Sequence, residues 1–166
     1  GMYSDSALEK VLVNYKFTSL DIAFITELSF GCIRYRKFLD HWIDHTSKLN
    51  HNKQPPKLRW LLHVGLYQIL KMDKIPYSAC ISTTVEIAKK SELNKLSGVV
   101  NAILRNVTRK LKINNLPNVP INKAERISLK ESIPIWLVNE MIAWFGIAET
   151  KKIAMAFNKK PKIDFR

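Results

Sequence analysis

Apolar residues recur every three or four positions along almost the whole chain, and this spacing constrains the fold more than any other feature of the sequence. Side chains at this interval share one face of an α-helix, whereas a half-buried β-strand alternates at every second position. Alternation of the second kind appears only in the last residues, KPKIDFR. The sequence therefore predicts an all-α protein.

Capping residues, prolines and glycines indicate where the helices begin and end. We expect helices at 4–12, from Ser19 or Asp21 onward, at 58–71, 79–90 and 99–112, and in a second unit at 134–146 and 148–158. Ser4 or Asp5 could cap the first of these helices and Ser78 the helix at 79–90. In the second unit, Pro134 and Gly146 stand at the two ends where these residues are favoured.

Two glycines lie inside predicted apolar helices, Gly31 and Gly65. A glycine in a helix interior costs roughly 1 kcal/mol relative to alanine. Close packing of another helix against the glycine would offset this cost, because no Cβ stands in the way. Both positions therefore predict tight helix–helix contacts.

Positive charge is concentrated in the later two thirds of the chain. Residues 1–50 contain six Lys/Arg and six Asp/Glu, whereas residues 51–166 contain twenty-one and eight, which accounts for the whole net charge of +13. Such an excess suits a polyanionic partner, since neutralised phosphates release counterions. Twenty of the twenty-seven cations are lysines in a chain also rich in Asn and Ile, so a compositional bias is the alternative explanation.

The predicted helix VVNAILRNVTRKLK at 99–112 separates these charges onto one side. On a helical wheel its aliphatic residues gather around Val100, while Arg105, Arg109 and Lys112 lie opposite. This basic face is either a nucleic-acid contact or the ordinary solvated side of a helix, because cations near a helix C-terminus are favoured in any case.

The periodicity also predicts the domain organisation. We expect a helical domain at 1–113, a linker at 114–132, where NNLPNVPINKAERISLKES loses the helical spacing, and the beginning of a further domain at 133–166. No apolar run is long enough to cross a membrane and no secretory signal is apparent. With Cys32 and Cys80 in apolar surroundings as buried thiols, these features predict a cytoplasmic protein without a membrane partner.

Three stretches together resemble one family: ITELSFGCIRYRKFLDHWI, LRWLLHVGLYQILKMDKIPYSACISTTVEIAKK and LSGVVNAILRNV. They resemble the helical domain of the NusB antitermination factors, and most closely the NusB-like N-terminal domain of the bacterial 16S rRNA cytosine-C5 methyltransferases called RsmB, Sun or Fmu. The resemblance covers about residues 4–112. The segment at 133–166 is similar to the one that enters the next domain of these enzymes, here truncated. The resemblance therefore implies a NusB-like helical bundle followed by a linker and a short helical extension.

The resemblance also implies a function. It suggests an RNA-binding accessory domain that helps position 16S rRNA, with RNA and the enzyme's own methyltransferase domain as partners. The cofactor S-adenosylmethionine and the catalytic residues would lie beyond Arg166, so we expect no cofactor, metal or catalytic residue in this chain. Two alternatives remain: a stand-alone NusB-type transcription antitermination factor that binds boxA-like RNA, and a scaffold that docks on its own catalytic domain.

In the NusB family the RNA surface resembles the place where the start of the 99–112 helix meets the start of the LRWLL helix. Lys95, Ser97 and Gly98 would supply a cation, a hydroxyl and unpaired backbone amides at the first of these sites, and Lys57 and Arg59 match the second. The complete set of predicted RNA-binding residues is Lys57, Arg59, Lys95, Ser97, Gly98, Asn101, Arg105, Arg109, Arg34, Arg36 and Lys37. The hypothesis requires the two helix starts to lie close together and not to be covered by acidic side chains.

Other side chains allow more than one interpretation. Arg34, Arg36 and Lys37 could equally face phosphate or pair with Asp40 and Asp44. His41 and His45 lie one helical turn apart, but no third metal ligand is evident and a metal site is not predicted. Trp136, Trp144 and Phe145 could stack on bases, although packing in a core is the favoured interpretation.

Two departures from the family pattern stand out. Ile81, Ser82, Thr83 and Thr84 occupy the positions where the family commonly has Val-Asn-Glu-Ala, which puts any polar contact of that Asn-Glu pair in doubt. The first helix of the family fold also lacks a counterpart, because only MYSDSALEKVL precedes NYKFTSLDIAF. Its absence could expose apolar surface.

Overall fold

The computed structural model describes residues 3–47 and 53–159, and all regular elements within these ranges are helices. The all-α prediction is therefore confirmed. The chain divides into two compact units, residues 1–116 and 117–166. No helix within the described ranges combines the length and apolar character needed to cross a membrane.

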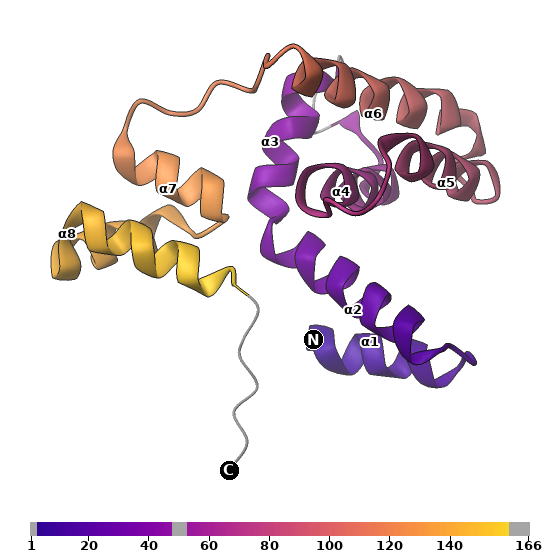
Figure 1. Ribbon diagram of the computed structural model, residues 1–166, viewed down its shortest axis with the longest axis horizontal. Helices are drawn as coiled ribbons and strands as arrows, with labels where there is room; N and C mark the ends of the chain where they lie inside the picture. The colour runs from indigo at the N-terminus through magenta and orange to yellow at the C-terminus, as the bar shows by residue number, and fades with distance from the viewer. Residues whose placement is uncertain (1–2, 48–52, 160–166) are drawn as a thin grey trace. The chain divides into compact units, whose positions relative to one another are not determined.

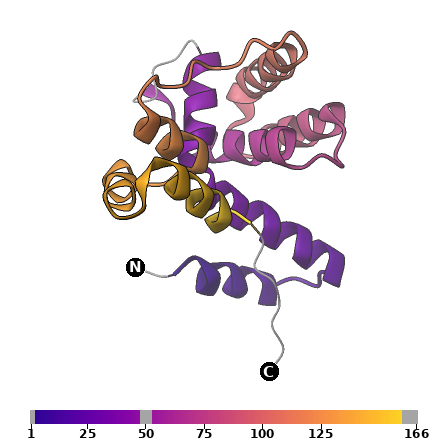
Figure 2. The same ribbon diagram turned by 60° about the vertical axis from the view of Figure 1, so that its left-hand side comes forward.

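The described residues of the first unit form six α-helices (Figure 1). They are α1 (Ser4–Val13), α2 (Ser19–Arg34), α3 (Arg36–Thr46), α4 (Pro56–Lys71), α5 (Tyr77–Lys89) and α6 (Ser97–Lys112), with the short 3-10 helix η2 (Asn94–Leu96) before α6. α4 packs against α2, α3, α5 and α6, and therefore forms the centre of the unit. α5 and α6 lie side by side, while α1 packs on α2 at the opposite end (Figures 1 and 2).

The core of this unit is built from the apolar stripes that the spacing predicts. Leu58, Leu62 and Leu66 of α4 are fully buried against Leu39, Ile43, Val100, Leu104 and Val107 of the neighbouring helices. Because the stripe of α6 faces inward, its basic residues are left on the outer side of the bundle. The two-sided pattern of the 99–112 segment thus fixes the orientation of this helix.

Both predicted glycine contacts are present. A Cβ added to Gly31 would lie 2.0 Å from Cζ of Tyr67, whose ring occupies the space beside the α2 backbone. A Cβ on Gly65 would lie 2.9 Å from Leu104 Cδ1 and 3.1 Å from Thr84 Oγ1. The two glycines therefore allow α2, α5 and α6 to approach α4 closely.

Helix boundaries differ from the prediction in four places. The N-cap of α2 is Thr18, which forms a capping box with Asp21, rather than Ser19 or Asp21 itself. α1 and α5 begin after Tyr3 and Pro76 without any side-chain cap, so Ser4, Asp5 and Ser78 do not fill that role. The helix predicted from Ser19 or Asp21 onward ends at Arg34, because Tyr35 has φ −98° and ψ 17° between α2 and α3.

The second unit consists of α7 (Lys123–Glu131) and α8 (Ile135–Phe157), packed around Ile127, Ile133, Val138 and Ala154. α7 lies within the segment predicted as a linker at 114–132, so nine residues of that segment are helical. Asn122 explains the difference, since its side-chain oxygen accepts hydrogen bonds from the backbone of Ala124 (2.8 Å) and Glu125 (3.2 Å) and so begins the helix.

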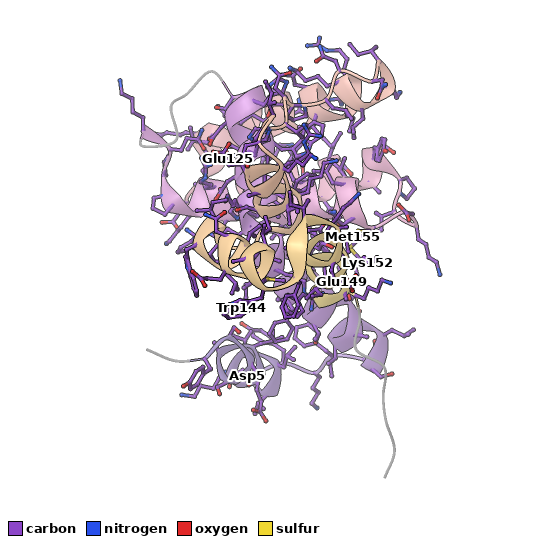
Figure 3. The ribbon with its side chains drawn as sticks, turned by 90° about the vertical axis from the view of Figure 1, so that its left-hand side faces the viewer. Asp5, Glu125, Trp144, Glu149, Lys152 and Met155 are labelled. Carbon is purple, nitrogen blue, oxygen red and sulfur yellow. The ribbon has the colours of Figure 1, made fainter. Side chains whose placement is uncertain are left out.

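α8 bends sharply at Gly146, whose φ of 71° and ψ of 168° lie outside the helical region. The bend gives the two helical halves that the sequence predicts on either side of this glycine. Figure 2 shows one half almost end-on and the other from the side. Figure 3 shows Trp144 on the first half and Glu149, Lys152 and Met155 along the second. A residue with a Cβ would be strained at this φ, so glycine is the residue that permits the bend.

Candidate nucleic-acid interface

A groove of about 740 Å³ runs between α5 and α6. Its α6 side is formed by Ser97, Gly98, Asn101, Arg105, Thr108, Arg109 and Lys112, and its α5 side by Tyr77, Ser78, Ile81, Ser82, Val85, Glu86 and Lys89. Five of the predicted RNA-binding residues, Ser97, Gly98, Asn101, Arg105 and Arg109, therefore lie in one groove. The reason is local, since they recur at helical spacing on the side of α6 opposite its buried stripe.

The guanidinium groups on the α6 side are held in place by neighbouring amides. Nε of Arg105 donates a hydrogen bond to Oδ1 of Asn101 (2.9 Å), and a terminal nitrogen of Arg109 donates one to Oδ1 of Asn106 (3.0 Å). Each guanidinium keeps further N–H donors for a ligand, because the group carries five. None of the ion pairs found among the described residues involves Arg105, Arg109 or Lys112.

The α5 side of the groove is more apolar. Ile81 belongs to the core and Val85 packs against it, while the ring of Tyr77 is 41% exposed at the beginning of the helix. The carboxylate on this side, Glu86, pairs with Lys89 at 2.8 Å, and the hydrogen bond from the Lys89 ammonium lowers the pKa of that carboxyl. The basic pattern of the sequence does not indicate the α5 side of the groove. Tyr77, Ser78, Ser82 and Lys89 nevertheless lie outside the buried stripe of α5.

The start of α6 carries no side-chain cap. Ser97 and Gly98 occupy its first turn, and a Cβ added to Gly98 would meet no atom within 4 Å. The N–H of Ser97 donates a hydrogen bond to the carbonyl oxygen of Asn94 in η2, so the amides left for a ligand are those that follow it. Lys95, in η2 directly before α6, is exposed but does not line the groove itself.

The cations at the start of α4 differ from those of α6, because they are paired with acidic side chains. Lys57 pairs with Glu92, and Nε and a terminal nitrogen of Arg59 donate hydrogen bonds to Asp40 (2.6 Å) and Asp44 (2.9 Å). The Arg59 side chain is only 16% exposed. The start of α4 does lie near the segment before α6, as the prediction requires, since Pro56, Lys57 and Trp60 share a shallow groove with Glu92, Leu93 and Leu96. Because Lys57 and Arg59 are paired with carboxylates, we do not include them in the candidate interface.

The Arg59 contacts form a partly buried network between α3 and α4. Burial by itself would raise the pKa of Asp40, but hydrogen bonds from His63 and Arg59 hold it below its ordinary value. Burial would likewise lower the pKa of Arg59, and its hydrogen bonds to Asp40 and Asp44 raise it instead. Nε2 of His63 lies 2.8 Å from Oδ1 of Asp40. The network therefore joins α3 to α4.

The remaining predicted cations lie on α2 and α3, away from the α5–α6 groove. Arg36 pairs with Asp40 at 3.9 Å, which is the pairing alternative that the helical spacing allows. Arg34 is half-buried in the last turn of α2, and Lys37 is exposed on α3. Neither residue lines the groove. The structure thus does not bring this cluster to the basic face of α6.

Comparison with known proteins supports the family suggested by the sequence. The model of the NusB family matches residues 1–109. The chain belongs to the NusB family. It is also 36% identical, over 99% of its length, to the probable ribosomal RNA small subunit methyltransferase B of Synechocystis, and 28% identical over the same share to the corresponding protein of Bacillus subtilis.

A further similar protein is the ribosomal RNA small subunit methyltransferase B of Sodalis glossinidius, with 31% identity over 88% of the chain. The chain spans about a third of the length of these relatives, 36% of the first two and 32% of the third. The NusB family match ends near the last turn of α6, whereas the similarity to the methyltransferases continues into α7 and α8.

At the positions where this chain departs from the NusB-family pattern, the structure shows both core and groove residues. Ile81 and Thr84 are buried, and Oγ1 of Thr84 donates a hydrogen bond to the carbonyl oxygen of Cys80 (2.6 Å). Ser82 and Thr83 are exposed, and Ser82 lines the groove. Thr83 stands where the family commonly has glutamate, so the outer face of α5 carries one carboxylate fewer.

The aromatic residues of α8 do not pack as predicted. Trp136, Trp144 and Phe145 are 65%, 68% and 53% exposed, so the core-packing interpretation is wrong for all three. Val138 and Met141 take the buried face of this half-helix instead. The pattern was ambiguous, because α8 is apolar on most sides and its spacing alone does not identify the inward face.

We assign neither the cysteines nor the histidines a catalytic or metal-binding role. Burial raises the pKa of Cys32 to about 12 and also raises the pKa of Cys80, so neither is an activated nucleophile. Lys110 donates a hydrogen bond to Nε2 of His45 (2.9 Å). In the ranges 3–47 and 53–159, no three His, Cys, Asp or Glu side chains gather in a way that could hold a metal ion.

Proposed function

We propose that this chain is an RNA-binding module of a 16S rRNA cytosine-C5 methyltransferase that depends on S-adenosylmethionine, and that it helps position the rRNA. The α5–α6 groove contacts the ribose-phosphate backbone through Arg105, Arg109 and Lys112, with Ser97, Gly98 and Asn101 at its other end. Lys95 adds positive charge beside the start of α6. The proposal includes a cytoplasmic location, because bacterial ribosomes are assembled there.

One observation carries the proposal: three cations line one side of a groove without a carboxylate paired to any of them. Unpaired cations on a solvated face are common, but here they share a concave surface with hydroxyl and amide side chains and a helix start. Phosphate contacts of this kind supply much of the affinity of proteins for nucleic acids.

The relatives' names support the enzyme class. The proteins from Synechocystis and Bacillus subtilis that match 99% of this chain are both named as probable small-subunit rRNA methyltransferases. Burial raises the pKa of Cys32 and Cys80, which does not suit attack on a base, so the proposal assigns the catalytic step to another part of such an enzyme. Methyl transfer and the S-adenosylmethionine site would therefore belong to another domain of such an enzyme.

The experiment that tests this role measures binding of a labelled 16S rRNA fragment by fluorescence anisotropy over a range of salt concentrations. We expect affinity to fall with salt, with a slope of log K against log salt of about −2 for three phosphate contacts. The double variant Arg105→Glu/Arg109→Glu should bind at least about a hundredfold more weakly.

The matched control is Lys10→Glu/Lys16→Glu, which makes the same change of net charge near α1, at the opposite end of the first unit (Figure 1). This variant should lose much less affinity. If both double variants lose the same affinity, only the overall charge matters and the groove is not the RNA site.

Large exposed apolar side chains favour a second role, docking on the enzyme's own methyltransferase domain. Leu20 in the first turn of α2 is 81% exposed, and Val11, Val13 and Ile22 are exposed nearby on α1 and α2. The exposed aromatic residues of α8 form a second such surface. Co-purification of the chain with that domain, before and after RNase treatment, tests this role. Loss of the complex with RNase would show that RNA alone bridges the two parts.

A further inference from the structure

The two sides of the α5–α6 groove differ in chemistry, and this difference specifies the form of RNA that fits. We propose that the groove holds a single RNA strand, with its backbone along α6 and its bases against α5, and that Tyr77 stacks on one of these bases. The inference rests on the proposed RNA-binding function and adds the strandedness of the ligand and a specificity residue.

The α6 side has the spacing that one backbone requires. Arg105, Arg109 and Lys112 follow one another at intervals of four and three residues, so their attachment points are about 6 and 4.5 Å apart along the helix axis. These steps are comparable to the distance between neighbouring phosphates of one strand. The hydrogen bonds from Arg105 to Asn101 and from Arg109 to Asn106 hold the two guanidinium groups in this row.

The α5 side offers a surface for bases rather than for phosphate. Tyr77, Ile81 and Val85 contribute ring and aliphatic surface, and Ser78 and Ser82 add hydroxyl groups at the edge. Tyr77 is 41% exposed, so part of its side chain can be reached by a base. Stacking on aromatic side chains is a main way in which proteins bind unpaired bases.

The order of the helices brings the two chemistries to the same end of the groove. α5 and α6 follow each other in sequence and lie side by side, so the first residues of α5 are opposite the last turns of α6 (Figure 1). Tyr77 therefore shares the groove end with Arg109 and Lys112. A nucleotide with its phosphate on these cations can direct its base toward the tyrosine ring.

The groove is a surface depression between two packed helices. The axes of packed helices lie about 8–10 Å apart, so a depression of this size cannot take in the full width of an RNA double helix. A duplex could touch only the outer edge of α6, and its bases would remain stacked and paired out of reach of Tyr77. Unpaired RNA is therefore the class of ligand that uses both sides.

The test compares a labelled twelve-nucleotide single strand with a duplex of the same sequence, using the full chain and three variants. We expect the single strand to bind more tightly, Tyr77→Ala to weaken single-strand binding about tenfold or more, and Tyr77→Phe to bind like the natural chain. Duplex binding should change little in either variant. A 2-aminopurine base in the strand should be quenched by the natural chain and by Tyr77→Phe, but not by Tyr77→Ala.

The outcomes separate this inference from the function on which it rests. If Arg105→Glu/Arg109→Glu binds the single strand normally, the proposed RNA-binding function itself fails. If that variant loses binding but Tyr77→Ala does not, or affects strand and duplex equally, the RNA site remains and the two-sided arrangement is wrong. Displacement of the single strand by a micromolar acidic helical peptide that needs Tyr77 would reassign the groove to a protein partner. Circular dichroism of each variant verifies its helix content.

Discussion

The start of α4 and the outer face of α6 both present arginines and lysines, yet the structure gives them different roles. Arg59 of α4 is held by Asp40 and Asp44 of α3, which precede it by nineteen and fifteen residues. Within the part of the chain that the structure describes, the guanidinium groups of Arg105 and Arg109 hydrogen-bond to amide side chains of their own helix and form no ion pair. The comparison teaches that the neighbours of a cation, and not its presence in a basic segment, decide whether it is available to a ligand.

The largest expected effect tests the structural role of Arg59. We expect Arg59→Ala to lower the free energy of unfolding by about 2–3 kcal/mol, because it leaves partly buried carboxylates without their cation. RNA affinity of the folded protein should change little. Urea unfolding and RNA titration measure the two quantities, and a large loss of RNA affinity without loss of stability would reverse the assigned roles.

The pH dependence of the Asp40 network should be the next largest effect. The folded-state pKa of Asp40 lies below the ordinary value of 3.8, so its ionised form stabilises the folded state above about pH 4, and this contribution is lost as pH falls through the lowered pKa. At neutral pH we expect Asp40→Asn to be less stable than the natural chain by about 1–2 kcal/mol.

Thermal unfolding at a series of pH values measures this difference, which should shrink between pH 5 and pH 2. An Asp40→Asn difference that stays constant over that range would show that the charge of Asp40 does not contribute.

A smaller effect is expected for Arg105→Ala, which should change RNA affinity rather than stability. Its side chain is exposed and pairs only with Asn101, so the free energy of unfolding should change by less than about 0.5 kcal/mol. RNA affinity should fall about fivefold through the loss of one phosphate contact. Equal behaviour of Arg59→Ala and Arg105→Ala in the two assays would remove the distinction between the α4 and α6 cations.

The smallest change concerns Gly98 at the start of α6. Since a Cβ at this position would meet no atom, Gly98→Ala should raise the free energy of unfolding by about 0.5 kcal/mol through its higher helix propensity. A fall in RNA affinity of the same variant would indicate that the backbone at this helix start approaches the ligand closely. Unchanged affinity would restrict the contact to the Tyr77 end of the groove.

Much of the α6 side of the site was predictable, because its residues are neighbours on one helix. The run from Leu93 to Ala124 contains no Asp or Glu, so the cations of α6 have no acidic partner nearby in sequence. The α5 side was not predicted, since its exposed residues are mostly neutral and carry no charge signal. Lys57 and Arg59 show the converse: their acidic partners come from residues 40, 44 and 92, which are distant in sequence, so their pairing could not be predicted.

The sequence by itself determined the helical class, the buried stripes of α4 and α6, and the two glycine contacts, because each follows from spacing or from a missing side chain. Only the tertiary structure decided which cations pair with carboxylates, that α5 completes the groove, and that the α8 aromatics face outward. Periodicity describes one helix at a time, whereas these features depend on distances between side chains of different helices, which packing alone sets.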